Sequence, residues 1–142
     1  MASVGRVRVA VEWGQPTMRG RTIWGELVEW GRVWMPGADE ATVLTTDDVV
    51  TIGTVTVPAG DHTLYTLPTT DRFELLISRD VGQFHTVYDS SLVIGRAEMR
   101  LQTTPAPTEG LTFTIRPSAE SRSATLTLSW DQREYAVSLT AR

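Results

Sequence analysis

The sequence predicts an all-β fold, an antiparallel β-barrel or β-sandwich of about eight to ten short strands with one Trp-rich loop or helical turn. Two observations predict this class. Apolar and polar residues alternate with a period of two along many segments, as in strands that bury one face. Turn-forming residues separate those segments at short intervals. The length of 142 residues fits a single β domain covering residues 1–142.

The alternation is clearest near the two ends of the chain. Val7, Val9 and Val11 alternate with polar or small neighbours and predict the first strand. Further strands are predicted at 96–102, 111–116, 125–130 and 135–139. The segment 103–110, with Pro105 and Pro107, is expected to be an exposed connection, and Asp131-Gln132 a tight hairpin turn.

The middle of the chain is rich in β-branched and aromatic residues, which favour strands. We expect strands at 41–46, 49–57, 62–67 and 73–78. Turns are expected between them at 47–48, 58–61, 68–71 and 80–82.

The segment 17–37 breaks this pattern. It holds Trp24, Trp30 and Trp34, and its apolar spacing fits neither a strand nor a helix. We expect a loop with one helical turn near 23–28, packed across a barrel mouth or a sheet face. Long aromatic loops in compact domains are usually functional or act as plugs, and both readings stay open here.

Composition excludes several function classes. The net charge is −4 without a basic stripe, so nucleic acid is not an expected partner. The chain has no Cys and no Lys, which removes disulfides, thiolate nucleophiles and Schiff-base chemistry. No apolar run approaches the roughly eighteen residues of a membrane span, so no membrane partner is expected. The N-terminus has no apolar signal-peptide region, which predicts a cytoplasmic location.

Few side chains are candidates for catalysis. His62 and His85 are the histidines, which titrate near neutrality, and they have no close metal-ligand spacing, so neither a metal nor a cofactor is expected. For Glu40 two alternatives stay open: an inward-facing acid with a raised pKa, or a cap on backbone N–H groups of the preceding loop. Our catalytic candidates are His85, Glu40 and Tyr65.

Several motifs in order resemble the bacterial domain-of-unknown-function family 2911. They lie at 18–28, 30–34, 37–42, 57–60, 64–68, 111–113 and 124–130. The resemblance implies no agreed activity, although many family members look exported. The family pattern has an Arg after the Trp at position 34, an Asn before Glu40 and an aromatic residue after the Ala-Gly turn. Here these positions are Met35, Asp39 and His62, which implies that a polar cluster has become more apolar.

Two functional hypotheses follow from these features. The first is an apolar small molecule held in an aromatic and Met-lined cavity, where a cofactor-independent cyclase of natural-product type would act by folding its substrate. Its ligand-binding residues would be Trp24, Trp30, Trp34, Met35, His62, Phe84, Tyr88 and Met99. The second is a non-catalytic binding or protein-interaction module, which would include a homodimer formed through the Trp-rich face.

Overall fold

The computed structural model describes residues 1–82 and 88–142 and has nine strands in these ranges. The strands are β1 (Ala2–Val4), β2 (Val7–Glu12), β3 (Val43–Thr46), β4 (Val50–Ile52), β5 (Val55–Val57), β6 (Gly60–Pro68), β7 (Phe73–Ser78), β8 (Val93–Pro117) and β9 (Ser123–Ala141). They form one antiparallel sheet in the order β1-β2-β3-β6-β7-β8-β9-β4-β5, with β1 and β5 at its two edges. The predicted all-β antiparallel class is confirmed, and the sheet is not closed into a barrel.

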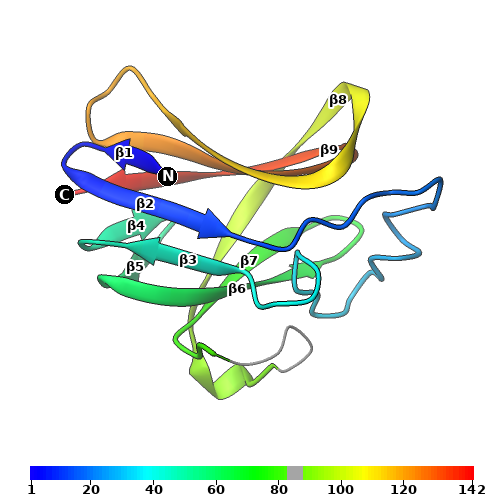
Figure 1. Ribbon diagram of the computed structural model, residues 1–142, viewed down its shortest axis with the longest axis horizontal. Helices are drawn as coiled ribbons and strands as arrows, with labels where there is room; N and C mark the ends of the chain where they lie inside the picture. Colours follow the sequence, from blue (N-terminus) through cyan, green and yellow to red (C-terminus); the bar gives the residue numbers. More distant parts are fainter. Residues whose placement is uncertain (83–87) are drawn as a thin grey trace.

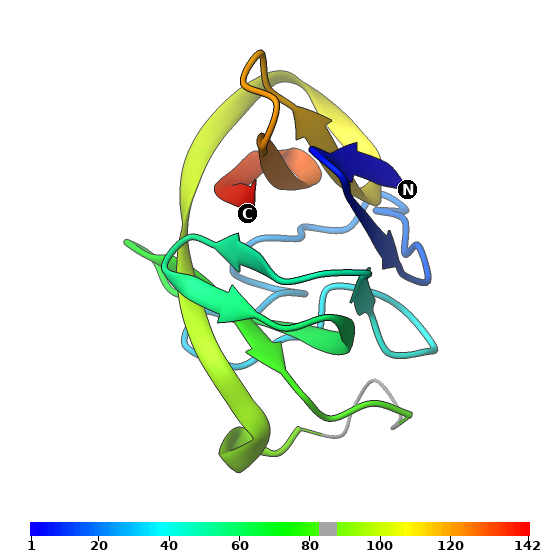
Figure 2. The same ribbon diagram turned by 90° about the vertical axis from the view of Figure 1, so that its left-hand side faces the viewer.

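The long strand β8 connects two layers of this sheet. Its first part, Val93 to Met99, pairs with β7, and its remainder pairs with β9. Figures 1 and 2 show β8 arching from the layer of β3, β6 and β7 over to the layer of β9. The main core lies between the layers and includes Leu44, Leu75, Leu126 and Trp130, all at most 1% exposed.

Two predicted breaks in the C-terminal third are wrong. The segment 103–110 belongs to β8, and Asp131-Gln132 lies inside β9. The ladder instead changes register between Thr103 and Thr108 and again before Thr112. Pro105 and Pro107 lie in this interval, where the missing proline N–H costs no ladder hydrogen bond. Asp131 takes a positive φ of 51°, as at an irregularity in a continuous strand, not at a chain reversal.

The strand predicted at 49–57 is in fact a hairpin. Its arms are β4 and β5, paired through Ile52 and Val55, so Gly53-Thr54 is a two-residue turn. Gly53 has a φ of +59°, which glycine adopts without steric cost. Strand β1 was not predicted from the sequence; it pairs back onto β2 through a turn at Gly5-Arg6.

A second, smaller apolar cluster covers the outer face of the β6–β7 hairpin. Because strand side chains alternate between faces, Leu75 and Ile77 enter the main core while Leu76 points to the other side. Leu76 packs there with Met35 and Tyr65.

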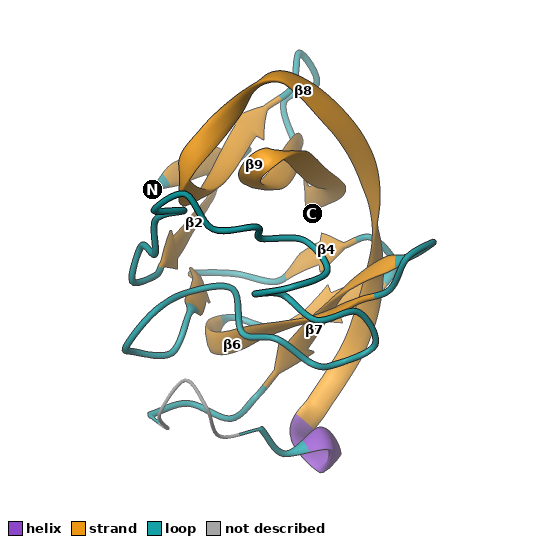
Figure 3. Cartoon of the chain, turned by 90° about the vertical axis from the view of Figure 1, so that its right-hand side faces the viewer, coloured by secondary structure: helices purple, strands orange, loops and turns teal. Residues whose placement is uncertain are grey.

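The connection between β2 and β3 crosses one end of the fold, between the β8–β9 ladder and the β6–β7 hairpin (Figure 3). It is tied to both layers, because Met18 N–H donates to Glu109 O and Gly31 N–H donates to Pro68 O. The expected loop is present, but its turn is closed by Val28 N–H donating to Ile23 O, an i to i+5 bond that is wider than an α-helical turn. A 3-10 turn at Ser90–Leu92 precedes β8. None of the described helical residues forms an element long and apolar enough to cross a bilayer.

Candidate functional site

An aromatic cluster joins the Trp-rich loop to the strands beneath it. Its members are Trp24, Trp30, Trp34, Phe73, Trp130 and Tyr135. The Trp24 ring lies at the centre, with centroid distances of 6.4 Å to Trp30 and 5.4 Å to Tyr135. Trp34 stacks on Trp130 at 6.0 Å with the ring planes 9° apart. Such pairs contribute about 0.5–1.5 kcal/mol each beyond area burial, so the loop is fixed by packing as well as by its backbone.

Hydrogen bonds position Trp34 and Trp24, and close packing against Gly25 positions Trp30. Trp34 and Thr66 exchange both backbone bonds at 2.8 Å, which places the loop as a short extra strand beside β6. The Trp24 indole N–H donates to the Trp130 carbonyl at 3.1 Å. Gly25 allows Trp30 to approach, because a Cβ at this position would lie 2.8 Å from the indole nitrogen.

Arg133 lies over two rings of this cluster. Its guanidinium carbon is 5.2 Å from the Trp30 ring centroid and 5.9 Å from that of Trp24, within the range of a cation–π contact. One of its terminal nitrogens donates to the Tyr135 hydroxyl at 2.9 Å. Burial raises the pKa of the Tyr135 phenol, while the hydrogen bond and the positive charge of Arg133 act in the opposite direction. The phenol is therefore neutral at physiological pH.

A cleft opens beside Arg133 where the β6–β7 turn approaches β8 and β9. We call it the arginine cleft; its volume is about 350 Å³. It is lined by residues 69–73, 98–101, Arg133 and Tyr135. Phe73, Met99 and Tyr135 are buried and supply apolar wall, and Leu101 adds an exposed apolar side chain.

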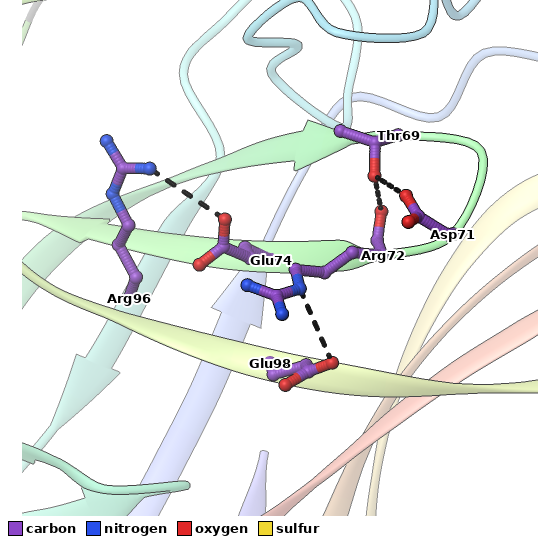
Figure 4. A network of polar contacts seen from close by, with 6 residues as sticks. All are labelled: Thr69, Asp71, Arg72, Glu74, Arg96 and Glu98. Carbon is purple, nitrogen blue, oxygen red and sulfur yellow. Dashed lines mark hydrogen bonds and ion pairs between the residues drawn. The ribbon is translucent and has the colours of Figure 1, made fainter.

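Polar contacts within the β6–β7 turn, and between this turn and β8, hold the rim of the cleft (Figure 4). The Thr69 hydroxyl lies 2.9 Å from Arg72 O and 3.1 Å from the Asp71 carboxylate, so these two acceptors share its single hydrogen, and the contacts close the β6–β7 turn. Arg72 and Glu98 approach to 3.8 Å between two exposed side chains, so this pair contributes at most about 1 kcal/mol. Among the described residues, no carboxylate forms an ion pair with Arg100 or Arg133.

The residues predicted to bind a ligand lie on two faces of the sheet. Trp24, Trp30 and Trp34 belong to the aromatic cluster, and Met99 lines the arginine cleft. Met35 and Tyr88 lie in the outer apolar cluster with the catalytic candidate Tyr65. The Tyr65 and Tyr88 rings meet edge to face at 4.8 Å. Phe84 and His85 fall at 83–87, outside the described residues.

His62 lies on β6 opposite Leu44, and it is only 4% exposed. Its Nδ1 atom is buried with no hydrogen-bond partner in the described part of the chain. Burial lowers the pKa of the imidazole, against opposing contributions from Asp61 and from the Gly60 backbone. A neutral imidazole at this position is part of the core and not of the arginine cleft.

Glu40 is exposed and lies in the segment before β3. With Glu12 and Asp39 it borders a second cleft of about 400 Å³ beside Trp13 and Gly14. The described residues nevertheless contain no group of three or more His, Asp or Glu side chains arranged to hold a metal ion.

The arginines of the cleft and the role of Tyr135 were not predicted from the sequence. A signal for Arg133 was present, since Arg133, Tyr135 and Val137 alternate along one strand face that is otherwise apolar. The wrong turn predicted at Asp131-Gln132 hid that alternation. Arg72, in the β6–β7 turn, and Arg100, on β8, offered no comparable signal, because exposed arginines are common.

A protein-family model matches almost the whole chain. The model of the family described as "Protein of unknown function (DUF2911)" matches residues 1–139. The chain belongs to this family. No curated protein and no solved structure matches the chain.

Three positions are expected to depart from the DUF2911 pattern, and the structure places them in different surroundings. Met35 is in the outer apolar cluster and His62 is in the core. Asp39 is exposed in a turn, with a φ of +68°.

Proposed function

We propose that this protein is a small-molecule binding module whose ligand site is the arginine cleft. The observation that carries the proposal is the lining of this cleft. Apolar wall from Met99, Phe73 and Leu101 stands next to the donors of Arg133 and Tyr135. Ligand sites typically combine apolar surface with a few placed polar groups, in volumes of roughly 300–1,000 Å³.

The position of Arg133 supports the proposal further. A flexible arginine loses side-chain entropy when it is fixed, and here Trp24, Trp30 and Tyr135 fix it before any ligand arrives. A preorganised donor lowers the entropic cost of binding. Arg133 lies on β9, where it pairs with Thr103 of β8 in a ladder that continues to Ala136, and the end of β9 pairs with β4.

The aromatic rings themselves are less suited to serve as a flat binding platform. Trp24 has other rings against it from several sides, and Trp34 stacks on the buried Trp130. Their role in the proposal is to support the cleft. Cyclisation of a folded apolar substrate stays a prediction, and the residues we expected to line its cavity are divided between two faces of the sheet.

A blocking substitution tests the proposal. Thr70 is exposed and lines the cleft, so Thr70→Trp should fill the cleft without disturbing the core. Thr56→Trp, on the exposed side of β5, is the matched control. Each protein is incubated with a bacterial metabolite extract and separated by size, and its bound compounds are identified by mass spectrometry. We expect compounds retained by the wild type and the control to be lost from Thr70→Trp. Equal retention by all three proteins would contradict the assignment of the cleft.

A further inference from the structure

The charge of the arginine cleft indicates the chemistry of its ligand. Three arginines line it, at positions 72, 100 and 133, against the two carboxylates of Asp71 and Glu98. One net positive charge therefore remains in a chain whose overall net charge is −4. A local reversal of sign in a concave site raises the local concentration of anions.

The donors of Arg133 are only partly used within the protein. A guanidinium has five N–H donors in a planar fork, and among the described residues Arg133 makes one hydrogen bond, to the Tyr135 oxygen. Because that oxygen acts as the acceptor, the phenolic hydrogen of Tyr135 remains able to donate. Arg133 and Tyr135 together thus offer a fork and a third donor to an acceptor-only group.

We propose that the arginine cleft binds a monocarboxylate with an apolar body, a specificity that rests on the function proposed above. The carboxylate accepts from the Arg133 fork and from Tyr135, and the body lies along Met99 and Leu101. A planar carboxylate matches a guanidinium in a two-point contact. A phosphate dianion fits less well, because Asp71 and Glu98 share the cleft and leave a single net charge to balance it.

A matched pair of probes separates charge from shape. We would titrate isotope-labelled protein at pH 7 with 3-phenylpropanoate and with its neutral amide, 3-phenylpropanamide, and follow the NMR shifts of residues 99–101 and 133–135. The acid should saturate these shifts with an affinity at least tenfold above that of the amide. Raising the salt concentration should weaken binding of the acid and leave the amide unchanged.

Two substitutions locate the effect. Arg133→Gln should bring the affinity for the acid down to that of the amide, whereas Arg116→Gln, an exposed arginine outside the cleft, should stay within twofold of the wild type. Arg133→Lys keeps the charge and loses the fork, so it should lie between them.

The other outcomes separate the monocarboxylate specificity from the binding function itself. Equal affinity of acid and amide at the cleft would overturn the monocarboxylate specificity and leave the binding function standing. Tighter binding of phenyl phosphate than of the acid would likewise overturn it in favour of a dianion. Shifts confined to residues outside the cleft, or none with either probe, would overturn the proposed function itself.

Discussion

Replacing Gly25 by alanine should displace Trp30 from its stack on Trp24 and loosen the support of Arg133. Two features of Gly25 make it sensitive: its φ is +91°, and an added Cβ would lie 2.8 Å from the Trp30 indole nitrogen. Gly31 in the same loop provides a matched control. Its φ is +82°, but a Cβ there would meet no atom within 4 Å.

The two substitutions share one energetic cost and differ in another. A left-handed backbone costs a non-glycine residue about 1–2 kcal/mol, and this applies to Gly25→Ala and Gly31→Ala alike. Gly25→Ala also displaces an aromatic pair worth about 0.5–1.5 kcal/mol and a cation–π contact worth about 0.5–1 kcal/mol. We therefore expect Gly25→Ala to destabilise the protein by about 1–2.5 kcal/mol more than Gly31→Ala does.

Urea unfolding of the two variants and the wild type measures this difference. Near-ultraviolet circular dichroism reports separately on the Trp24–Trp30 stack, and only Gly25→Ala should change it. Equal free energies of unfolding, with unchanged spectra in both variants, would refute the view that Trp30 is held by close contact with Gly25.

Three further predictions concern buried groups. Met35 is 5% exposed, so Met35→Arg should lower the stability by several kcal/mol, whereas Met35→Leu should lower it by less than about 1.5 kcal/mol. Thermal unfolding measures both losses. Similar losses in the two variants would mean that Met35 does not lie in a packed core. Trp130→Phe should destabilise the protein by about 1 kcal/mol or more, because it removes the hydrogen bond that the Trp130 indole donates to Glu109 O at 2.9 Å. An unchanged midpoint of urea unfolding would contradict a stabilising role for this hydrogen bond. The folded state lowers the pKa of His62 below its ordinary value of 6.5, so the unfolded chain binds the proton more readily as the pH falls. The stability due to the neutral imidazole is therefore complete above pH 6.5 and is lost as the pH falls towards the folded-state pKa, by at most about 1.4 kcal/mol per pH unit. His62→Leu should lack this slope between pH 7 and 5.5, and parallel pH profiles would show that His62 does not titrate differently on folding.

Most of the fold could be predicted from the period-two alternation. Along β7 and β9 the inward positions are apolar in the sequence and buried in the structure, as Leu75, Leu126 and Leu139 illustrate. The alternation of apolar and polar residues does not reveal where a strand bends, because a β-bulge inserts one residue without requiring the residue types that are typical of turns. The prolines at 105 and 107 therefore predicted a connection, whereas β8 continues through them with a change of register.

Less of the candidate site could be predicted. The sequence singled out Trp24, Trp30 and Trp34 because their spacing fits no regular element, and the structure places them in one cluster. Met35 was grouped with these tryptophans because it directly follows Trp34 in the sequence. Met35 packs on the outer face of β6 and β7 instead, because adjacent residues of an extended segment point to opposite sides.

The arginine cleft depends on long-range register, which the sequence alone does not specify. Phe73 lies beside Met99, and Leu101 beside Tyr135, only because β7, β8 and β9 pair as they do. A one-residue slip of β9 would turn Arg133 and Tyr135 to the other face of the sheet.

The most direct test of the cleft as the ligand site is an NMR map of a diverse fragment library on the labelled wild-type protein. If the cleft is the site, the fragments that bind should shift residues 69–73, 98–101, 133 and 135 together. Shifts that gather instead at the cleft bordered by Glu12, Asp39 and Glu40 would contradict it.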